Sequence, residues 1–468
     1  MLRKMIVSAL VLTIAASLSA CKAPKLTNDE GKTATQGETK QEQTQQKGEL
    51  KTVKFAIPEP DLKYMQPIFD NYNDSQSEYV IEPISIVSGP DMYTKLTMMM
   101  QSPKTCPDVI AEDGFMINSD VAAGRLMSLD DALADWSDLN NFIPSVLEGG
   151  KAEDGKLYGL PKTTDTQGIY YNKKLLEKAG IATPWQPKDW AEIIEVGKKL
   201  KETNADVEDF IPMFLYAAKN TPEETSMRTF QVLYSGTGGS LYDYNEKKWV
   251  IDSEKLLKVF NFVNDVYNVE KIGSTPAFAG QNQVGSTITS EYMRTDKIGL
   301  LFTGNWVMAN FAPEGSYPFP KAEEVWGYAS TPTWDGGGNK YTTMSGGWAW
   351  SIPNNANEKE GAIEVLKMLG SKDTTLKVLI ATGDLTPRKD LADNPEYIER
   401  PFSVAKDATA QLDFTHFRPS VDGYSSLSTM FTDTIESIVV GSATPEQALE
   451  NFKTAMIRTV GTDRVIEK

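Results

Sequence analysis

The stretch TMSGGWAWSIP, residues 343–353, combines residue types that small-molecule binding sites use. Gly346 and Gly347 lack side chains, so another group can approach the backbone closely there. Trp348 and Trp350 follow directly and, in a strand, point to the same side. A tryptophan ring offers a flat apolar face of the kind that binds C–H groups. We expect Trp348, which is nearer the strand end, to contact a ligand and Trp350 to lie in the core.

Acidic side chains follow two predicted strands. Glu59 and Asp61 come after the first strand, and Glu112 and Asp113 close the third. In open α/β sheets, ligands bind beyond the carboxyl ends of the strands, and carboxylates accept strong hydrogen bonds from ligand hydroxyls. The alternative for Asp113 is to cap the next helix. We expect one residue of each pair in the site.

Polar and aromatic residues elsewhere are weaker candidates. Arg228 lies on a predicted helix before SGTGG, where it either reaches a cleft or pairs on the surface. Trp334, in the polar loop TWDGGGNK, either stacks on a ligand or covers the protein body. Tyr170 and Tyr171 alternate in a strand, so we expect one of them to face the cleft. The glycines of SGTGG do not form a phosphate loop, because no G-K-[ST] follows.

The elements that carry these residues alternate in type. Residues 51–58 and 78–87 have strand patterns, residues 61–75 and 91–102 have helical spacing, and residues 106–113 form a third strand. This β-α-β-α-β order predicts an α/β fold with open, mostly parallel sheets and helices on both faces. The length of the body, residues 51–468, predicts two domains. Residues 325–334 are expected to form a strand that returns to the first domain.

The N-terminus has the features of a secretory signal. Arg3 and Lys4 precede an uncharged run, residues 5–20, that is shorter than the roughly 20 apolar residues of a membrane span. Its end, LSAC at residues 18–21, resembles a bacterial lipobox. That resemblance implies a signal peptide at 1–20, cleavage before Cys21 and lipidation of Cys21, including palmitate. The alternative is an ordinary secretory signal with a chance cysteine.

The next segment and the overall composition narrow the function further. Residues 21–50 contain no aromatic residue and predict a disordered tether. A net charge of −17 without a basic stretch argues against nucleic-acid binding. Cys106 is the one internal cysteine and His416 the one histidine, so a His- or Cys-rich metal site is excluded. We expect no metal, no cofactor and no Ser/His/Asp triad.

Five stretches together resemble a known family. They are residues 157–181, 190–200, 298–311 (IGLLFTGNWVMANF), 346–371 (GGWAWSIPNNANEKEGAIEVLKMLGS) and 381–391 (ATGDLTPRKDL). In this order and spacing they are similar to the extracellular solute-binding proteins of carbohydrate ABC importers, the maltose-binding-protein-like group. The resemblance covers the body from Lys51 to about Lys468. No single motif carries it.

The resemblance implies two α/β lobes, each a mostly parallel sheet flanked by helices, with a ligand cleft between them. Three crossover segments are expected near Asp165, Ser330 and Ser371. Lobe 1 then comprises 51–163 and 330–370, and lobe 2 comprises 164–329 and 371–468. The implied function is capture of a sugar or oligosaccharide and its delivery to the transmembrane subunits of an ABC permease. The protein is expected to be a monomer at the outer face of the bacterial cell membrane, and not an enzyme.

The resemblance also adds site residues: Gly347 beside the approaching sugar, Asn305 and Trp306 after a strand, Asp165 in the first crossover, and Arg388 after a turn near the cleft. The predicted ligand-binding residues are Glu59, Asp61, Glu112, Asp113, Asp165, Arg228, Asn305, Trp306, Trp334, Gly347, Trp348 and Arg388.

Two other functions fit the same residues. A lipid-anchored glycosidase would use similar aromatic faces with two carboxylates at a defined separation. A receptor for a peptide, polyamine or phosphate would use acidic walls, or helix N-termini and arginines. The adjacent glycines and tryptophans favour a sugar.

Overall fold

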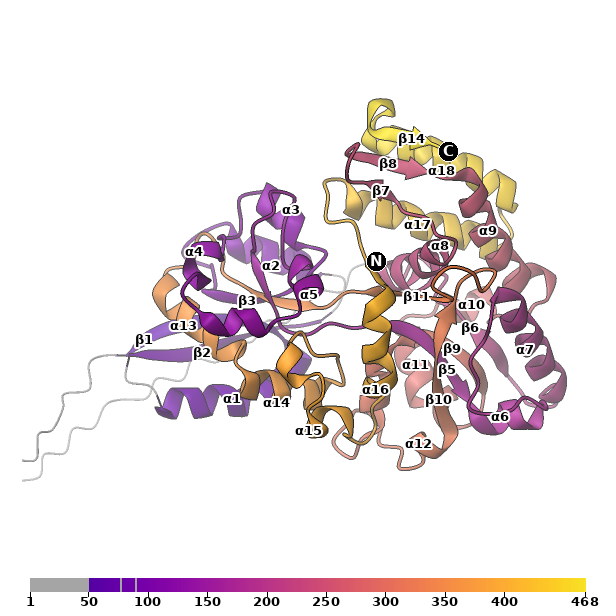
Figure 1. The fold of residues 1–468 in the computed structure, drawn as a ribbon, viewed down its shortest axis with the longest axis horizontal. Coiled ribbons are helices and arrows are strands. Elements are labelled where there is room, and N and C mark those ends of the chain that lie inside the picture. Colours follow the sequence, from indigo (N-terminus) through magenta and orange to yellow (C-terminus); the bar gives the residue numbers. More distant parts are fainter. Residues whose placement is uncertain (1–49, 76–77, 89–90) are drawn as a thin grey trace, which may run out of the picture. The chain divides into compact units, whose positions relative to one another are not determined.

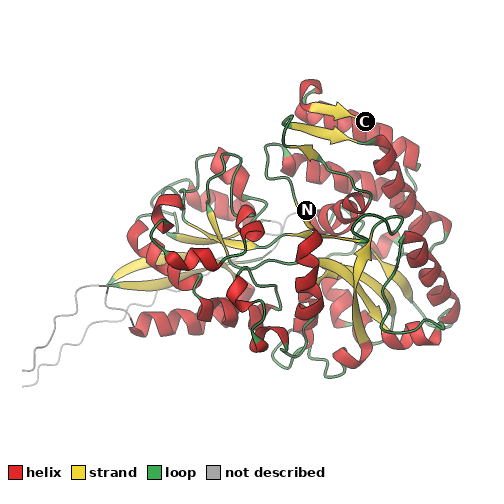
Figure 2. Cartoon of the chain, in the orientation of Figure 1, coloured by secondary structure: helices red, strands yellow, loops and turns green. Residues whose placement is uncertain are grey.

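The computed structural model describes residues 50–75, 78–88 and 91–468 (Figure 1). The predicted signal peptide, the lipidation of Cys21 and residues 21–49 of the predicted tether lie outside the described residues. Helices and strands alternate along the chain, as predicted, and build sheets flanked by helices (Figure 2). Within the described residues, no helix combines the length and apolar character that crossing a membrane requires.

The first sheet has the strand order β2-β1-β3-β12-β4. Its strands are β1 (Lys51–Pro58), β2 (Tyr79–Ile86), β3 (Val109–Asp113), β4 (Gly159–Pro161) and β12 (Trp348–Ser351). β1 is parallel to β2 and β3, whereas β12 is antiparallel to both β3 and β4. The predicted β-α-β-α-β order is confirmed here, with α1 (Leu62–Ser75) and α2 (Met92–Met100) between the strands.

The helices of this sheet follow their apolar spacing. α1 buries Met65, Ile68, Phe69 and Tyr72, which share one face because 3.6 residues make a turn. Later in the chain, α13 (Lys359–Leu369) packs against β1 and β12 of the same sheet. Trp350 is fully buried in the same core, with its ring 5.4 Å from that of Phe55.

The second sheet has the order β13-β11-β10-β5-β9-β6. Its strands are β5 (Gln167–Asn172), β6 (Ile211–Phe214), β9 (Ile298–Gly304), β10 (Trp326–Pro332), β11 (Tyr341–Ser345) and β13 (Thr415–Phe417). The pairs β13–β11 and β9–β6 are parallel, and the other three pairs are antiparallel. This sheet is therefore mixed, not mostly parallel as expected. Alternation of apolar residues shows that a strand forms but does not give the direction of its neighbour.

β10 and β11 differ from the expectation in a second way. The strand around Ser330 was expected to return to the first lobe. Instead, Ser330 pairs with Gly168 of β5, and Thr331 pairs with Thr342 of β11, all in the second sheet. The chain reaches the first sheet only at Trp348. β10 and β11 form a hairpin and therefore stay in one sheet, and the pairing of β10 with the distant strand β5 makes this the second sheet.

A third, small sheet has the order β14-β8-β7, from β7 (Tyr242–Asp243), β8 (Lys248–Ile251) and β14 (Val465–Glu467). β7 and β8 form a hairpin, and the C-terminal strand β14 lies parallel to β8. Trp249, at the centre of β8, is fully buried. The C-terminus of the chain thus supports this hairpin.

Helices around the second and third sheets make the largest core. α7 (Trp190–Thr203), α8 (Val232–Gly236), α9 (Ser253–Asn264), α17 (Tyr424–Val439) and α18 (Pro445–Val460) contribute to it. Phe230, Phe431 and Phe452 stack at its centre, with ring centroids 4.6 to 5.9 Å apart. Both strand tyrosines, Tyr170 and Tyr171, are buried, so neither faces a cleft as expected. The remaining helices are α3 (Ile117–Ala122), α4 (Asp130–Leu133), α5 (Pro144–Glu148), α6 (Lys173–Lys178), α10 (Pro276–Ala279), α11 (Val284–Ser290), α12 (Ala322–Val325), α14 (Lys372–Thr382), α15 (Pro395–Ile398) and α16 (Ala405–Thr409).

Three chain segments meet between the first and second sheets. Thr164 and Leu385 exchange backbone hydrogen bonds of 3.0 and 2.8 Å. The Thr164 hydroxyl donates to the Gly346 carbonyl oxygen at 3.2 Å, and the Gly346 N–H donates to Asp165 Oδ1 at 3.1 Å. Residues 162–166, 346–347 and 383–388 are therefore joined to one another.

The predicted helix interruption near Ser371 is confirmed. Ser371 caps α14, its hydroxyl accepting from the Thr374 N–H. α14 nevertheless still packs against α1 of the first sheet. The chain therefore turns away from that sheet after α14 and not at Ser371.

Candidate functional site

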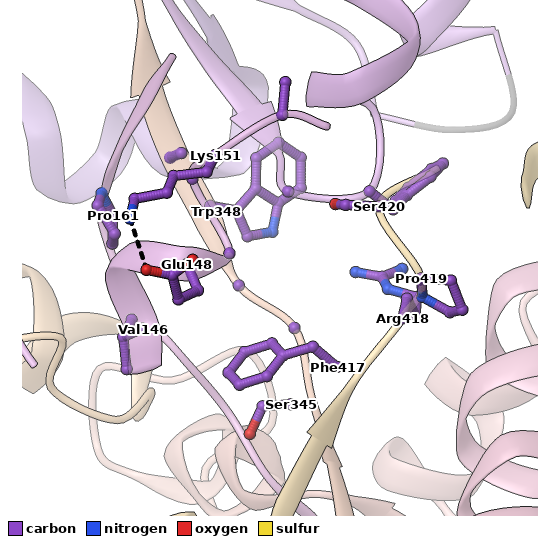
Figure 3. A pocket seen from close by; sticks show the side chains of 18 of the residues that line it. Val146, Glu148, Lys151, Pro161, Ser345, Trp348, Phe417, Arg418, Pro419 and Ser420 are labelled. Atoms are coloured by element: carbon purple, nitrogen blue, oxygen red, sulfur yellow. Dashed lines mark hydrogen bonds and ion pairs between the residues drawn. The ribbon is translucent and has the colours of Figure 1, made fainter. Parts of the chain in front are cut away.

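A cavity of 390 Å³ lies where segments of the first and second sheets face each other (Figure 3). The first sheet contributes the turn after β3, α5 with the loop that follows it, and the start of β12. The second sheet contributes the end of β11, the last residue of β13 (Phe417) and residues 418–421 that follow it. Strand ends and loops therefore form its wall, as is usual for ligand sites in α/β proteins.

The segment Ser345–Trp348 forms one wall of the cavity. Gly347 has φ +133°, and a Cβ atom there would lie 2.2 Å from the Thr163 carbonyl oxygen, so the close backbone approach requires glycine. Trp348 lines the cavity and extends its ring into it (Figure 3). Trp350, two residues on, is 1 % exposed. The structure therefore places Trp348 at the cavity and Trp350 in the core, and contact between Trp348 and a ligand stays a prediction.

Arg418 connects the two sides of the cavity. Its guanidinium donates to Asp113 Oδ1 and to Glu223 Oε2, each at 3.0 Å, and lies 4.8 Å from the centre of the Phe115 ring. The side chain is 8 % exposed. Asp113 is the last residue of β3 in the first sheet and Arg418 directly follows β13 of the second, so this ion pair joins the two sheets beside the cavity. Asp113 itself does not line the cavity. The sequence prediction included Asp113 but missed Arg418, although Arg418 also lies at the end of a strand.

Aromatic rings line the cavity beside Arg418. Phe417 lies across the cavity from Trp348 (Figure 3), and a Cβ atom at Gly149 would be in van der Waals contact with its ring. Phe115 packs edge-on against Tyr93 at 5.3 Å. The sequence analysis predicted none of Phe417, Phe115 and Tyr93 as site residues, because isolated phenylalanines and tyrosines near turns are far more often part of a core.

Lys162 lies beside Trp348 and forms an ion pair with Asp61. Its Nζ atom is 5.9 Å from the centre of the Trp348 ring and 5.5 Å from that of Tyr64. Lys162 is 5 % exposed, so both its carboxylate partner and the rings stabilise a charge held away from water. The structure therefore brings Asp61 close to Trp348, through a lysine that the sequence prediction missed.

Two carboxylates lie at the crossing segments. Asp165 accepts from the Gly346 N–H and from Gln167 Nε2, both at 3.1 Å. Burial raises the pKa of Asp165 to about 6, against the opposing effects of the Gly346 N–H and Arg418. Burial also raises the pKa of Asp384 to about 7, and the charge of Asp165 adds to this. Asp384 was not predicted.

Arg228 and Trp306 form a separate cluster. The Arg228 guanidinium lies 4.9 Å from the centre of the Tyr216 ring and 5.0 Å from that of Trp306. A Cβ atom at Gly383 would lie 3.4 Å from the Trp306 carbonyl oxygen, so the cluster is near the crossing segments. The structure thus brings together Arg228 and Trp306, although neither of them lines the 390 Å³ cavity.

Three predicted residues are buried away from the cavity. Asn305 holds the crossing segments, its Oδ1 accepting from the Thr166 N–H and its Nδ2 donating to the Gly383 carbonyl oxygen. Arg388 is fully buried with Asp138 and Asp390. Glu112 is 1 % exposed. Burial raises the pKa of Glu112 well above its usual value, and Asp120 adds to this.

Two other predicted residues are exposed. Trp334 is 39 % exposed in the β10–β11 turn, with Lys258 Nζ 4.1 Å from the centre of its ring. Glu59 is exposed in the turn after β1. Neither lines the cavity. In the part of the chain that the structure describes, no three His, Cys, Asp or Glu side chains are grouped to hold a metal ion.

The chain was compared with known protein families. The model of the bacterial extracellular solute-binding protein family matches residues 57–375. The matched range contains the end of β1 and all of β2 to β12, and therefore most of the first sheet and all of the second sheet except β13.

Individual proteins also match. The arabinooligosaccharide-binding protein of Halalkalibacterium halodurans is 22 % identical over 405 residues, covering 80 % of this chain and 82 % of its own length. The galactooligosaccharide-binding protein of Bacillus subtilis is 23 % identical over 354 residues, covering 74 % of this chain and 75 % of its own. Among solved structures, the GacH receptor of Streptomyces glaucescens, solved unliganded and with acarbose, superposes with a TM-score of 0.74. It is 19 % identical and covers 88 % of this chain and 98 % of its own. This last likeness shows the fold.

Proposed function

Since the chain belongs to the family of bacterial extracellular solute-binding proteins, we propose that its cavity captures a sugar or oligosaccharide for an ABC importer. The family implies an extracytoplasmic location and a binding protein, not an enzyme. The observation that carries the proposal is the Trp348 ring, which extends into a cavity whose opposite wall is Phe417. The names of the oligosaccharide-binding relatives support the same ligand class.

The walls suit the two surfaces of a sugar ring. Trp348 and Phe417 offer flat faces for its C–H groups, which pack against aromatic rings. Arg418, which lines the cavity and is held by Asp113, offers a charged donor for its hydroxyls, and such bonds are the strong ones. A neutral ligand fits best. Both cations of the described lining, Arg418 and Lys151, are already paired with carboxylates, which disfavours a phosphate ester.

Capture involves both sheets. Asp113 and Trp348 belong to the first sheet, whereas Phe417 ends β13 of the second sheet and Arg418 follows it. A ligand that touches both sides stabilises their closed arrangement more than an open one, and so drives closure. We place one lobe at 51–163 with 347–370 and the other at 164–346 with 392–468. Residues 371–391 pass between them. Asp61, Asp165, Arg228 and Trp306 remain proposed ligand contacts of the closed form.

The protein is proposed to work at the cell surface as a monomer. Lipidation of Cys21 would hold it at the outer face of the membrane, where it delivers sugar to the transmembrane subunits of the permease. Metabolic labelling with a fatty acid tests the lipid, which Cys21→Ala should abolish. Labelling that persists in this variant would refute the anchor site.

Isothermal titration of the full chain against mono- and oligosaccharides tests the function. We expect saturable binding at micromolar Kd or below, with the sugar recovered intact. Trp348→Ala should weaken binding roughly tenfold, because a well-placed aromatic contact is worth about 1 kcal/mol beyond its buried area. Trp334→Ala, away from the cavity, is the matched control and should bind normally. Binding of glycerol phosphate or a polyamine, with no response to any sugar, would overturn the ligand class.

A further inference from the structure

We propose that the sugar site continues to a second aromatic position, Tyr244 on the β7–β8 hairpin, so that the preferred ligand is a neutral oligosaccharide and not a monosaccharide. This inference rests on the proposed function and extends it. Tyr244 lies just after β7 and lines the same cavity as Trp348. It comes from the third sheet, which neither the predicted crossovers nor the predicted site residues included.

The cavity has a buried end and an open end. At the buried end, Ser345 is fully buried and Thr163 is 3 % exposed, both beside the crossing segments. At the open end, Glu153 and Gly155 are exposed, and Tyr244 is 63 % exposed. A ligand confined to the buried end would leave the Tyr244 ring in water. A longer ligand extending outward would reach it.

The hairpin holds Tyr244 in place without covering it. The Tyr244 ring packs edge-on against Tyr242 at 5.1 Å, and Tyr242 packs in the same way on the buried Trp249 at 5.2 Å. Asp243 Oδ1 accepts from the N–H groups of Asn245 and Glu246, which fixes the turn. β14 pairs with β8 beneath it. Less side-chain freedom is then lost when a ligand packs on the ring, so the contact favours binding more.

Other residues of the cavity wall match a neutral, hydroxyl-rich chain. Lys151 Nζ pairs with Glu148 Oε1 at 2.6 Å, and this pair lines the cavity (Figure 3). The pair offers both donors and acceptors but little net charge. Ser420 adds a hydroxyl beside Arg418. An aromatic face with a surrounding polar rim is the pairing that binds a sugar ring, here repeated at the open end of the cavity.

The test compares ligand length with the two aromatic positions. Isothermal titration would use the full chain and a series of one glycan type, from the monosaccharide to the tetrasaccharide, chosen from the sugars that the wild type binds. The wild type should bind the longer members more tightly. Tyr244→Ala should weaken binding of the longer members by roughly five- to tenfold and leave the monosaccharide within twofold of wild type. Tyr244→Phe should retain most of the affinity, since it keeps the ring.

Two controls separate this inference from the proposed function. Trp348→Ala should weaken every member of the series, including the monosaccharide. An unchanged melting temperature of Tyr244→Ala would show that the fold is intact, as expected for an exposed side chain. If Tyr244→Ala affects all lengths equally, or none, the second position is refuted while sugar binding stands. If the wild type binds no sugar, the proposed function and this inference both fail.

Discussion

Arg388 and Arg418 have nearly the same surroundings and different access to the cavity. Arg388 pairs with Asp138 and Asp390 and lies 5.3 Å from the centre of the Phe142 ring. It also donates to the Gly370 carbonyl oxygen at 2.6 Å. All its hydrogen-bonding capacity is thus directed to the protein, and it is fully buried.

Arg418 likewise pairs with two carboxylates, Asp113 and Glu223, and lies 4.8 Å from the centre of the Phe115 ring. Each carboxylate receives one hydrogen bond from it, and the guanidinium lines the cavity. An arginine held between two acids and over a phenylalanine can thus either stabilise the fold or form part of a binding wall. Access to the cavity makes the difference, and local chemistry does not.

The largest effect on stability should come from replacing Arg388, the fully buried arginine. Arg388→Ala leaves Asp138 and Asp390 facing each other without a cation, and breaking a buried ion pair typically costs about 3–5 kcal/mol. We expect a loss of unfolding free energy of this size in urea denaturation, with the sugar Kd of the folded protein unchanged. A change in Kd without a loss of stability would assign Arg388 to the site and remove the contrast with Arg418.

Arg418→Ala should instead weaken sugar binding more than it lowers the stability of the fold. Removing a charged hydrogen-bond donor from a binding wall costs about 1.5–3 kcal/mol, or roughly ten- to a hundredfold in Kd. Titration calorimetry measures this, and Arg418→Lys is the control that keeps the charge but loses the forked geometry. Part of the loss reflects the two acids left unpaired, so stability should be measured in parallel. Unchanged affinity would show that Arg418, like Arg388, stabilises the fold and does not take part in binding.

Asp384 differs from the acids beside these two arginines, because among the described residues its carboxylate forms no ion pair and Arg400 donates only to its backbone carbonyl oxygen, at 2.9 Å. Its pKa is raised to about 7 by burial and by Asp165. A raised carboxyl pKa contributes stability that is present below the unfolded value, about 3.9, and is lost as pH rises through 7. Asp384→Asn should therefore be more stable than wild type above pH 7, by about 2 kcal/mol after allowance for partial exposure.

That advantage should shrink toward pH 4 and vanish below it, where the wild-type carboxyl is protonated in both the folded and the unfolded state. Thermal unfolding at a series of pH values checks this. Asp390→Asn is the opposite control, because Asp390 supports a buried arginine, and its loss should destabilise the protein at neutral pH. If Asp384→Asn gives the same difference at pH 4 and pH 8, then ionisation of Asp384 is not the cause.

Local elements followed from the sequence because their causes are local. Helix α1 is set by apolar residues at helical spacing, and the break between α13 and α14 by a serine that caps the second helix. The sheet that each strand joins could not be predicted from the sequence. β10 has the alternation of a strand, but its pairing with β5 depends on residues more than 150 positions away. The mixed direction of the second sheet was missed for the same reason.

The residues of the candidate site likewise fall into those that local sequence predicts and those that it does not. Trp348 and Gly347 were predictable, because the run of glycines and tryptophans carries its own chemistry. Asp113 was predicted only as one of a pair, since a strand end does not say which of two adjacent acids points inward. Arg418, Phe417 and Lys162 were missed, because each gains its role from segments distant in sequence. Arg388 was assigned to the site on the turn before it, and its burial was not visible there.

By itself, the sequence determined the α/β class, the helices and strands, the acidic character of the chain and the solute-binding family. These depend on composition, spacing and the order of motifs. Only the tertiary structure decided which sheet holds β10 and β11, which arginine reaches the cavity and that a C-terminal strand supports the Tyr244 hairpin. Each of these depends on contacts between distant segments, which form only when the whole chain packs and buries its apolar surface.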